Sequence, residues 1–170
     1  MESVDHIKSV LNLLPHPKEG GYYVETYRSD ELIPAVAFPG RYDGPRHLAT
    51  AIYYLLTPDT FSAMHRLSAD EIFHFYLGDP VEMLHLLPDG SGKILTLGPE
   101  ILDGMSPQVI VPRGVWQGSR LHPGGRFALL GTTVSPGFEL SDYESGCRDA
   151  LVESYPLFRN LIVALTYPHP

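Results

Sequence analysis

The sequence has 170 residues, of which 44% are hydrophobic and 19% charged, and this composition is typical of one globular domain with a packed core. The 12 Lys and Arg residues are outnumbered by 20 Asp and Glu residues, and the formal charge of −8 excludes nucleic acid and anionic membranes as expected partners. Because the sequence contains no window of about 20 apolar residues and no basic leader segment, we expect a cytoplasmic protein with a single domain over residues 1–170.

The first predicted element is a short amphipathic helix. Its apolar positions recur at helical spacing and prolines end the pattern; these residues are Val4, Ile7, Leu11, Leu14, Pro15 and Pro17. Residues 22–28 are aromatic and β-branched with alternation, which predicts a strand. Residues 34–46 include three Pro and two Gly, so we expect a long loop that is functional or contributes to an oligomer contact.

Short strand-like segments then follow one another, separated by turns rich in Gly and Pro. They cover residues 48–56, 61–67, 71–77, 81–87, 93–97, 108–112, 115–121 and 126–135. So many short strands without intervening helices predict an all-β sandwich or barrel, and we favour a closed or jelly-roll barrel.

Helical spacing returns after Cys147, at Leu157, Phe158, Leu161, Ile162 and Leu165. This pattern predicts one or two C-terminal helices packed on the outside of the barrel. Cys147 is the single cysteine and belongs to no CxxC motif, so we interpret it as a buried or half-buried small hydrophobe rather than a reactive thiol.

Two polar residues, His65 and Glu71, are predicted to point into the barrel. Side chains alternate between the two faces of a strand, and the apolar neighbours Phe61 and Ala63 place His65 inward. Glu71 shares a strand face with Phe73, Phe75 and Leu77, and a buried carboxylate must find a partner or change its protonation state. His65 is the available partner. The two residues are interpreted either as an acid–base pair or as a structural hydrogen bond inside a filled core.

The spacing of His65, Glu71 and Gly78 resembles the first sequence motif of the cupin superfamily, and Pro112 with Gly114 resembles the second. An uncharacterised cupin family, the domain of unknown function DUF985 or cupin_5, is similar to this chain in residues 20–28, 65–76 and 135–143. The resemblance implies a double-stranded β-helix, or jelly-roll cupin barrel, with a short N-terminal helix and one or two C-terminal helices. It also implies a homodimer, since cupins of this kind commonly pair barrels through edge strands.

The chain departs from the metal-binding cupins at two positions. Those cupins hold their metal with three His and one Glu, whereas Leu67 stands at the second His position and Gln117 at the third. An amide is a poor ligand for transition metals that prefer imidazole. We therefore expect no cofactor, and a divalent metal held by His65, Glu71 and Gln117 is the less favoured alternative.

A second resemblance concerns the substrate. The stretch from Glu19 to Tyr27 looks like part of the dTDP-sugar 3,5-epimerases, which are metal-free cupins with a His general base. In that family an Arg, an aromatic residue and a Glu of this stretch help to hold the nucleotide, often across a dimer interface. The resemblance implies Tyr23 and Glu25 as pocket or interface residues, while Gly20 stands in place of the Arg. The alternative interpretation of this stretch is an ordinary edge strand.

Further ligand-binding candidates follow from the second motif and from the loop after the last predicted strand. Gln117 is expected either to face the cavity as the counterpart of a ligand His or to be a buried structural amide. Trp116 is interpreted either as a core residue or as a platform for the ligand. Phe138 and Glu139 are expected either to cap the mouth of the barrel or to lie in a solvated loop.

Three functions remain open. The first is a metal-independent isomerase or epimerase acting on a small polar, sugar-like metabolite, with His65 as general base and Tyr53, Tyr54 or Tyr76 as acid. The second is a non-catalytic ligand-binding or sensor cupin, and the third is a metal-dependent cupin enzyme with a degenerate site. The remaining histidines show no ligand spacing and are interpreted as structural or surface residues; they are His6, His16, His47, His85, His122 and His169.

Overall fold

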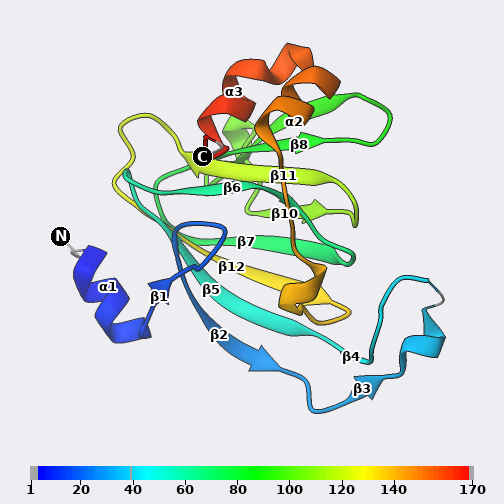
Figure 1. Ribbon diagram of the computed structural model, residues 1–170. Helices are drawn as coiled ribbons and strands as arrows, with labels where there is room; N and C mark the ends of the chain where they lie inside the picture. Colours follow the sequence, from blue (N-terminus) through cyan, green and yellow to red (C-terminus); the bar gives the residue numbers. More distant parts are fainter. Residues whose placement is uncertain (1–3, 39, 169–170) are drawn as a thin grey trace.

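The computed structural model describes residues 4–38 and 40–168, so His169 lies outside the described residues. Two antiparallel sheets face each other and form the body of the protein (Figure 1). The six-stranded sheet has the order β1-β2-β5-β12-β7-β10, and the five-stranded sheet has the order β13-β6-β11-β8-β9. β3 and β4 form a separate two-stranded ribbon. The predicted all-β, cupin-like barrel with peripheral helices is confirmed.

The strands follow the predicted segments closely, because alternating apolar residues and turn-forming Gly and Pro are local signals. Their bounds are β1 Leu14–Pro15, β2 Tyr22–Arg28, β3 Leu32–Ile33, β4 Arg46–His47, β5 Thr50–Leu56, β6 Phe61–Arg66, β7 Asp70–Gly78, β8 Val81–Leu86, β9 Gly92–Leu97, β10 Gln108–Val111, β11 Trp116–Leu121, β12 Ala128–Ser135 and β13 Glu144–Ser145.

Helices occur at both ends of the chain. The α-helices are α1 Val4–Leu11, α2 Arg148–Ser154 and α3 Arg159–Ala164, and the 3-10 turns are η1 Ala35–Ala37, η2 Ile101–Asp103, η3 Leu140–Asp142 and η4 Pro156–Phe158. Figure 1 shows α2 and α3 together on the outer side of the sheet that contains β8 and β11. Within residues 4–38 and 40–168, none of the helices has the length and apolar character needed to span a bilayer.

Clusters of buried apolar side chains hold these layers together. The largest lies between the two sheets and includes Phe73, Met83 and Leu130. A second cluster joins the outer face of β6 and β8 to α2 and α3, where Ile162 is fully buried. A third joins α1 to β5 through Ile7 and neighbouring side chains. Each fully buried aliphatic side chain stabilises the fold by roughly 1.5–3 kcal/mol, so the helices are part of the stability of the barrel.

Some side-chain predictions were wrong because regular periodicity is interrupted. Leu157, placed on the buried helical face, is 93% exposed, because Pro156 starts η4 and breaks the helix into two. Leu77, placed on the inner face of β7, is exposed because Tyr76 is an extra residue in the β7–β12 register. Leu14 is exposed in β1, outside the helix. Cys147 precedes the first residue of α2 and is exposed rather than buried.

Candidate functional site

A cavity of about 270 Å³ opens between the sheets, and it contains most of the residues predicted for the site. Its walls come from β2, β5, β6, β7 and β12, from the loop before β2, and from residues 136–145, which we call the strap. The strap runs across the front of the barrel in Figure 1 and joins β12 to α2. The predicted residues that line the cavity are His65, Glu71, Tyr23, Glu25, Phe138 and Glu139.

His65 lies in the cavity wall with a defined tautomer. Its Nδ1 is 2.7 Å from the carbonyl oxygen of Ala63, and because a carbonyl only accepts, Nδ1 carries the hydrogen. The Nε2 atom therefore carries a lone pair, and it lies 3.9 Å from Oε2 of Glu19. His65 is 1% exposed, and burial lowers its pKa, so the ring is neutral near pH 7. The ring of Tyr143 stacks on it, with centroids 4.8 Å apart.

A β-bulge in β6 decides which residues share this cavity. His65 pairs with Gln117 but Ser62 pairs with Ser119, so β6 has one residue more than β11 between these pairs. Ser62 consequently faces Glu19, and its hydroxyl donates to Oε1 of that carboxyl at 2.5 Å. Phe61, predicted to share the face of His65, packs instead with the cluster that joins the barrel to α2 and α3. Strict alternation was the wrong assumption here.

Glu71 is the second buried carboxyl of the cavity. It is 6% exposed and accepts a 2.6 Å hydrogen bond from Nε2 of Gln117. Gln117 is itself 1% exposed and does not line the cavity. Burial, together with the nearby Glu19, raises the pKa of Glu71 to about 6. Its hydrogen bond is thus with Gln117, while its interaction with His65 is electrostatic.

Replacing Glu71 by glutamine is expected to stabilise the protein at neutral pH. A raised pKa means that the folded state holds this proton more tightly than the unfolded chain does. Glu71 ionises with a pKa of 4.5 in the unfolded chain and of about 6 in the folded protein. The free energy of unfolding therefore falls by on the order of 2 kcal/mol as the pH rises through this range. Glutamine does not ionise, and its carbonyl oxygen still accepts from Gln117.

The measurement is urea unfolding of both proteins between about pH 4 and 8. The stability of Glu71→Gln relative to wild type should rise as the pH increases from 4.5 to about 6, and it should stay constant at higher pH. The neighbouring groups that set the pKa of Glu71, namely Glu19, His65, Gln117 and Thr132, are the same in both proteins. A difference that does not vary with pH would contradict the raised pKa.

The loop before β2 brings two residues into the cavity that the sequence analysis did not assign to the site. His16, interpreted as a structural or surface residue, lines the cavity, and Glu19 lies beside it with Oε2 3.9 Å from Nε2 of His16. The loop enters the barrel at Gly20, which has φ +95 and whose added Cβ would collide with the carbonyl oxygen of Phe61. The likeness of Glu19–Tyr27 to an epimerase segment was a signal for Glu19.

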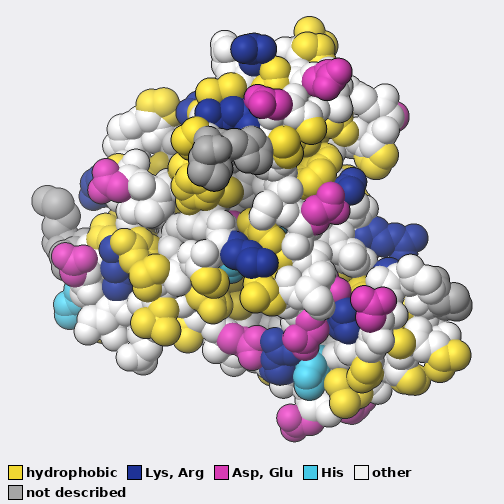
Figure 2. Space-filling model, in the orientation of Figure 1, with side chains coloured by type: hydrophobic (Ala, Val, Ile, Leu, Met, Phe, Trp, Pro, Cys, Tyr) yellow, Lys and Arg dark blue, Asp and Glu magenta, His cyan; other side chains and the backbone are white. Residues whose placement is uncertain are grey.

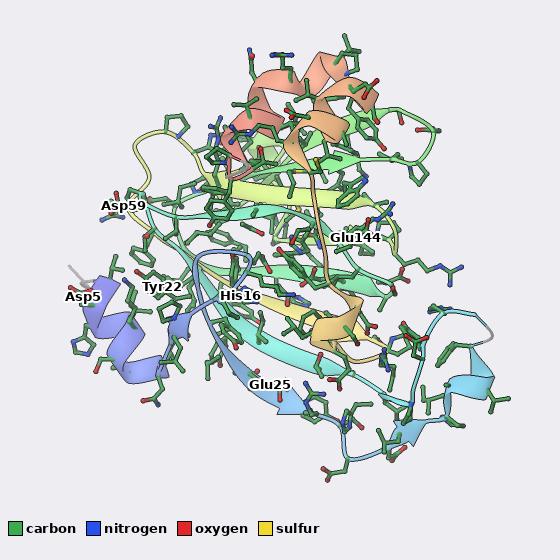
Figure 3. The ribbon with its side chains drawn as sticks, in the orientation of Figure 1. Asp5, His16, Tyr22, Glu25, Asp59 and Glu144 are labelled. Atoms are coloured by element: carbon green, nitrogen blue, oxygen red, sulfur yellow. The ribbon has the colours of Figure 1, made fainter. Side chains whose placement is uncertain are left out.

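The tautomer of His16 is also defined. Nδ1 accepts a 2.8 Å hydrogen bond from the backbone N–H of Glu19, so the hydrogen of the neutral ring lies on Nε2. Burial is the main reason that its pKa is lowered. The ring meets Tyr23 edge to face, with centroids 4.7 Å apart. His16, in the loop, and Glu25, on β2, are labelled in Figure 3.

An ion-pair cluster lies at the mouth of the cavity. Arg28 donates to both carboxylate oxygens of Glu25, at 3.0 and 2.8 Å, and to Oε1 of Glu139 at 2.7 Å. It also donates to the backbone oxygen of Phe138 at 3.3 Å. Figure 2 shows acidic and basic side chains next to one another on the lower part of this face, over β2. The cluster fastens the strap to β2.

Two other residues predicted for the site, Trp116 and Tyr53, do not line the cavity. Trp116 packs with the cluster around α2 and α3, and the guanidinium of Arg66 lies 4.4 Å from its ring centre. Tyr53 packs with the cluster around α1 and contacts Tyr76, at 6.0 Å between ring centroids. The inward tyrosine of β5 is Tyr54, which is 1% exposed and donates to the backbone oxygen of Gly20 at 2.8 Å. A continuous apolar run carries no signal for which face is inside.

The side chains of the cavity do not fit a metal ion of the kind that many cupins hold. Leu67 lines the cavity at the position of one ligand His, and Gln117 uses its amide to donate to Glu71. His16 holds its hydrogen on Nε2, the atom that faces Glu19. In the described part of the chain, no group of three or more His, Cys, Asp or Glu side chains is arranged to hold a metal ion.

The double-sheet barrel, with His65 and Glu71 of the first motif in the wall of its open cavity, is typical of the cupin class of proteins. The chain belongs to the Cupin superfamily (DUF985) family, whose model matches residues 5–146. An uncharacterized protein of Saccharomyces cerevisiae is 32% identical in an alignment of 149 residues that covers 83% of this chain and 74% of the yeast protein.

Solved structures agree with this assignment. A protein from Shewanella oneidensis has 34% identity and a TM-score of 0.87, covering 99% of this chain and 100% of that one. A hypothetical protein from Leishmania major has 30% identity and a TM-score of 0.88, covering 98% and 100%. A dTDP sugar isomerase from Desulfovibrio desulfuricans has 19% identity and a TM-score of 0.50, covering 75% of this chain and 85% of that one. The last shares the fold alone.

Proposed function

We propose that this protein binds a small polar metabolite in its barrel and moves a proton on it, as an isomerase or epimerase, with His65 as general base. The observation that carries the proposal is the state of His65: the ring is neutral, Nδ1–H donates to a backbone carbonyl, and Nε2 is free to accept. A general base needs this combination of a lone pair and a pKa near or below the working pH.

The second proton carrier in this proposal is a carboxyl group. An isomerase must return a proton after His65 has taken one, and Glu71, with its pKa of about 6, exists in both protonation states near neutral pH. Tyr143 stacks on His65, and burial raises its pKa, so its hydroxyl keeps its hydrogen and is a donor for the substrate. We propose Tyr143, rather than Tyr53, Tyr54 or Tyr76, as the tyrosine that donates to the substrate.

Sugar-like metabolites are the first class to test. One structural neighbour is named as a dTDP sugar isomerase, and a cavity of about 270 Å³ is of a size for a molecule no larger than a monosaccharide.

We also propose a homodimer, because among the described residues β1 pairs with β2 only at Tyr22 and Tyr23, which leaves the rest of that strand edge for a second copy.

Substitution of His65 by glutamine is expected to abolish proton exchange. Wild-type protein in D₂O should incorporate deuterium into a substrate from a panel of aldoses, ketoses, amino sugars and uronic acids, read by mass spectrometry. His65→Gln should lower the rate about 100-fold or more, with little change in melting temperature.

Tyr53→Phe is the matched control, because Tyr53 packs around α1 outside the cavity, and this variant should exchange at the wild-type rate. Undiminished exchange in His65→Gln would remove His65 as the base. Compounds that raise the melting temperature without any exchange would instead indicate a binding protein.

A further inference from the structure

The charged groups that line the cavity are mostly acidic. Among the described lining residues, four are glutamates and one, Arg28, is the only Lys or Arg. The glutamates are Glu19, Glu25, Glu71 and Glu139. Lys18 lies near the cavity, with Nζ 5.8 Å from the ring centre of Tyr143, but it is exposed, where solvent and salt screen its charge. The cavity is therefore expected to repel anions.

Arg28 is not available to an anionic ligand. A guanidinium has five N–H groups, and four of them are used by Glu25, Glu139 and the backbone oxygen of Phe138. Two carboxylates thus face one guanidinium at the mouth, and the local charge is negative even there. A phosphate or carboxylate would have to displace one of these charge-assisted hydrogen bonds.

Deeper in the cavity, two carboxyl groups have no Lys or Arg partner among the described residues. Glu19 accepts from the hydroxyl of Ser62, and Glu71 accepts from the amide of Gln117. Both side chains are largely buried, at 13% and 6% exposure respectively. Such groups are costly to ionise without a cation: burial raises the pKa of both, and the charge of Glu19 further raises the pKa of Glu71.

The two imidazoles do not supply that cation. His16 and His65 each lie 3.9 Å from Oε2 of Glu19, but burial keeps both rings neutral near pH 7. His65 offers the lone pair of Nε2, and the aromatic rings of Tyr23 and Tyr143 lie beside these imidazoles. The cavity thus presents hydrogen-bond acceptors and electron-rich ring faces to its ligand.

We infer that the ligand carries a protonated primary amine, which lies between Glu19 and Glu71 and completes the missing ion pair. An ammonium group has three donors and one positive charge, which matches two carboxylates, the lone pair on His65 and the adjacent rings. An amino sugar is the corresponding substrate class. The inference rests on the proposed function only in using the same cavity, and it does not require proton transfer.

The test compares matched compounds that differ in charge on one skeleton. D-Glucosamine, D-glucose and D-glucuronate form one set, and benzylamine, benzyl alcohol and benzoate form another, each titrated by calorimetry into the wild-type protein. In at least one set the amine should bind about tenfold or more tightly than its neutral analogue, with no binding of the carboxylate. Equal or tighter binding of the neutral or anionic compounds, or no binding of either amine, would overturn the inference.

Variants separate this inference from the proposed reaction. Glu71→Gln and Glu19→Gln should each weaken amine binding about tenfold, and Glu144→Gln, which alters a strap residue outside the cavity, should not. Calorimetry reports amine binding and deuterium exchange reports the reaction, so amine-selective binding without exchange would contradict only the proposed reaction, and exchange on a neutral sugar without amine selectivity would contradict only this inference. Tight binding of Zn²⁺ or Mn²⁺ that competes with the amine would identify a metal site instead and contradict the ammonium.

Discussion

Replacing Arg46 by alanine is expected to destabilise the protein by about 3–5 kcal/mol. Arg46 donates to both carboxylate oxygens of Asp142 in the strap, at 2.9 and 2.7 Å, and to the backbone oxygens of Gly44 and Pro45. The side chains of the pair are only 7% and 8% exposed. Removing the guanidinium leaves the carboxylate of Asp142 buried without a partner, and that unpaired charge causes most of the loss.

The measurement is the melting temperature and the urea midpoint, and a loss of this size lowers the melting temperature by roughly 6–20 °C in a protein of this length. Arg66→Ala is the matched control. Arg66 also holds the strap, through two 2.8 Å hydrogen bonds to Glu144, but those side chains are 39% and 56% exposed. The control should lose about 1 kcal/mol or less. Equal losses in the two variants would show that burial of the pair is not the cause.

Replacing Gly78 by alanine is expected to cost about 3 kcal/mol or more, from two sources that add. Gly78 has φ +106, a backbone conformation in which a residue with a Cβ is strained. An added Cβ would also collide with the carbonyl oxygen of Phe127, which accepts a hydrogen bond from the backbone N–H of Asp79 at 2.8 Å. The oxygen is fixed in place, so the collision is not relieved by a small shift.

Gly90→Ala separates the two sources. Gly90, in the turn between β8 and β9, has φ +86, but an added Cβ there meets nothing within 4 Å. Alanine at this position should cost about 1 kcal/mol, from backbone strain alone. Chemical denaturation of both variants gives the comparison. If Gly78→Ala loses no more than Gly90→Ala, close packing against Phe127 is not what requires glycine.

These two positions have different relations to the sequence. Gly78 was identified by its place in a cupin-like motif, and the structure gives that motif position a steric reason rather than a chemical one. Arg46 stood at the end of a stretch predicted as an irregular loop, with no local signal that its partner would be Asp142. An ion pair between residues this far apart in the chain depends on the fold of everything between them.

The strand segments and the barrel could be predicted from the sequence because their signals are local. Alternation within β2 and β7, and Gly and Pro in the turns, mark strands without knowledge of the rest of the molecule. His65 and Glu71 were found in the same way, through motif spacing and apolar neighbours, and both line the cavity. Trp116 packs in the core, which was one of its two interpretations, whereas Tyr53 was misplaced because a strand's periodicity alone does not say which face is covered by a helix.

By itself, then, the sequence determined the all-β fold, the family resemblance, and one His and one Glu in the wall of its cavity. Only the tertiary structure decided the rest of the site. The bulge in β6 turned Ser62 toward Glu19, the loop before β2 brought in His16 and Glu19, and the strap added Tyr143. The reason is physical: strand formation follows from neighbouring residues, whereas charge balance and protonation in a cavity depend on segments that meet only after folding.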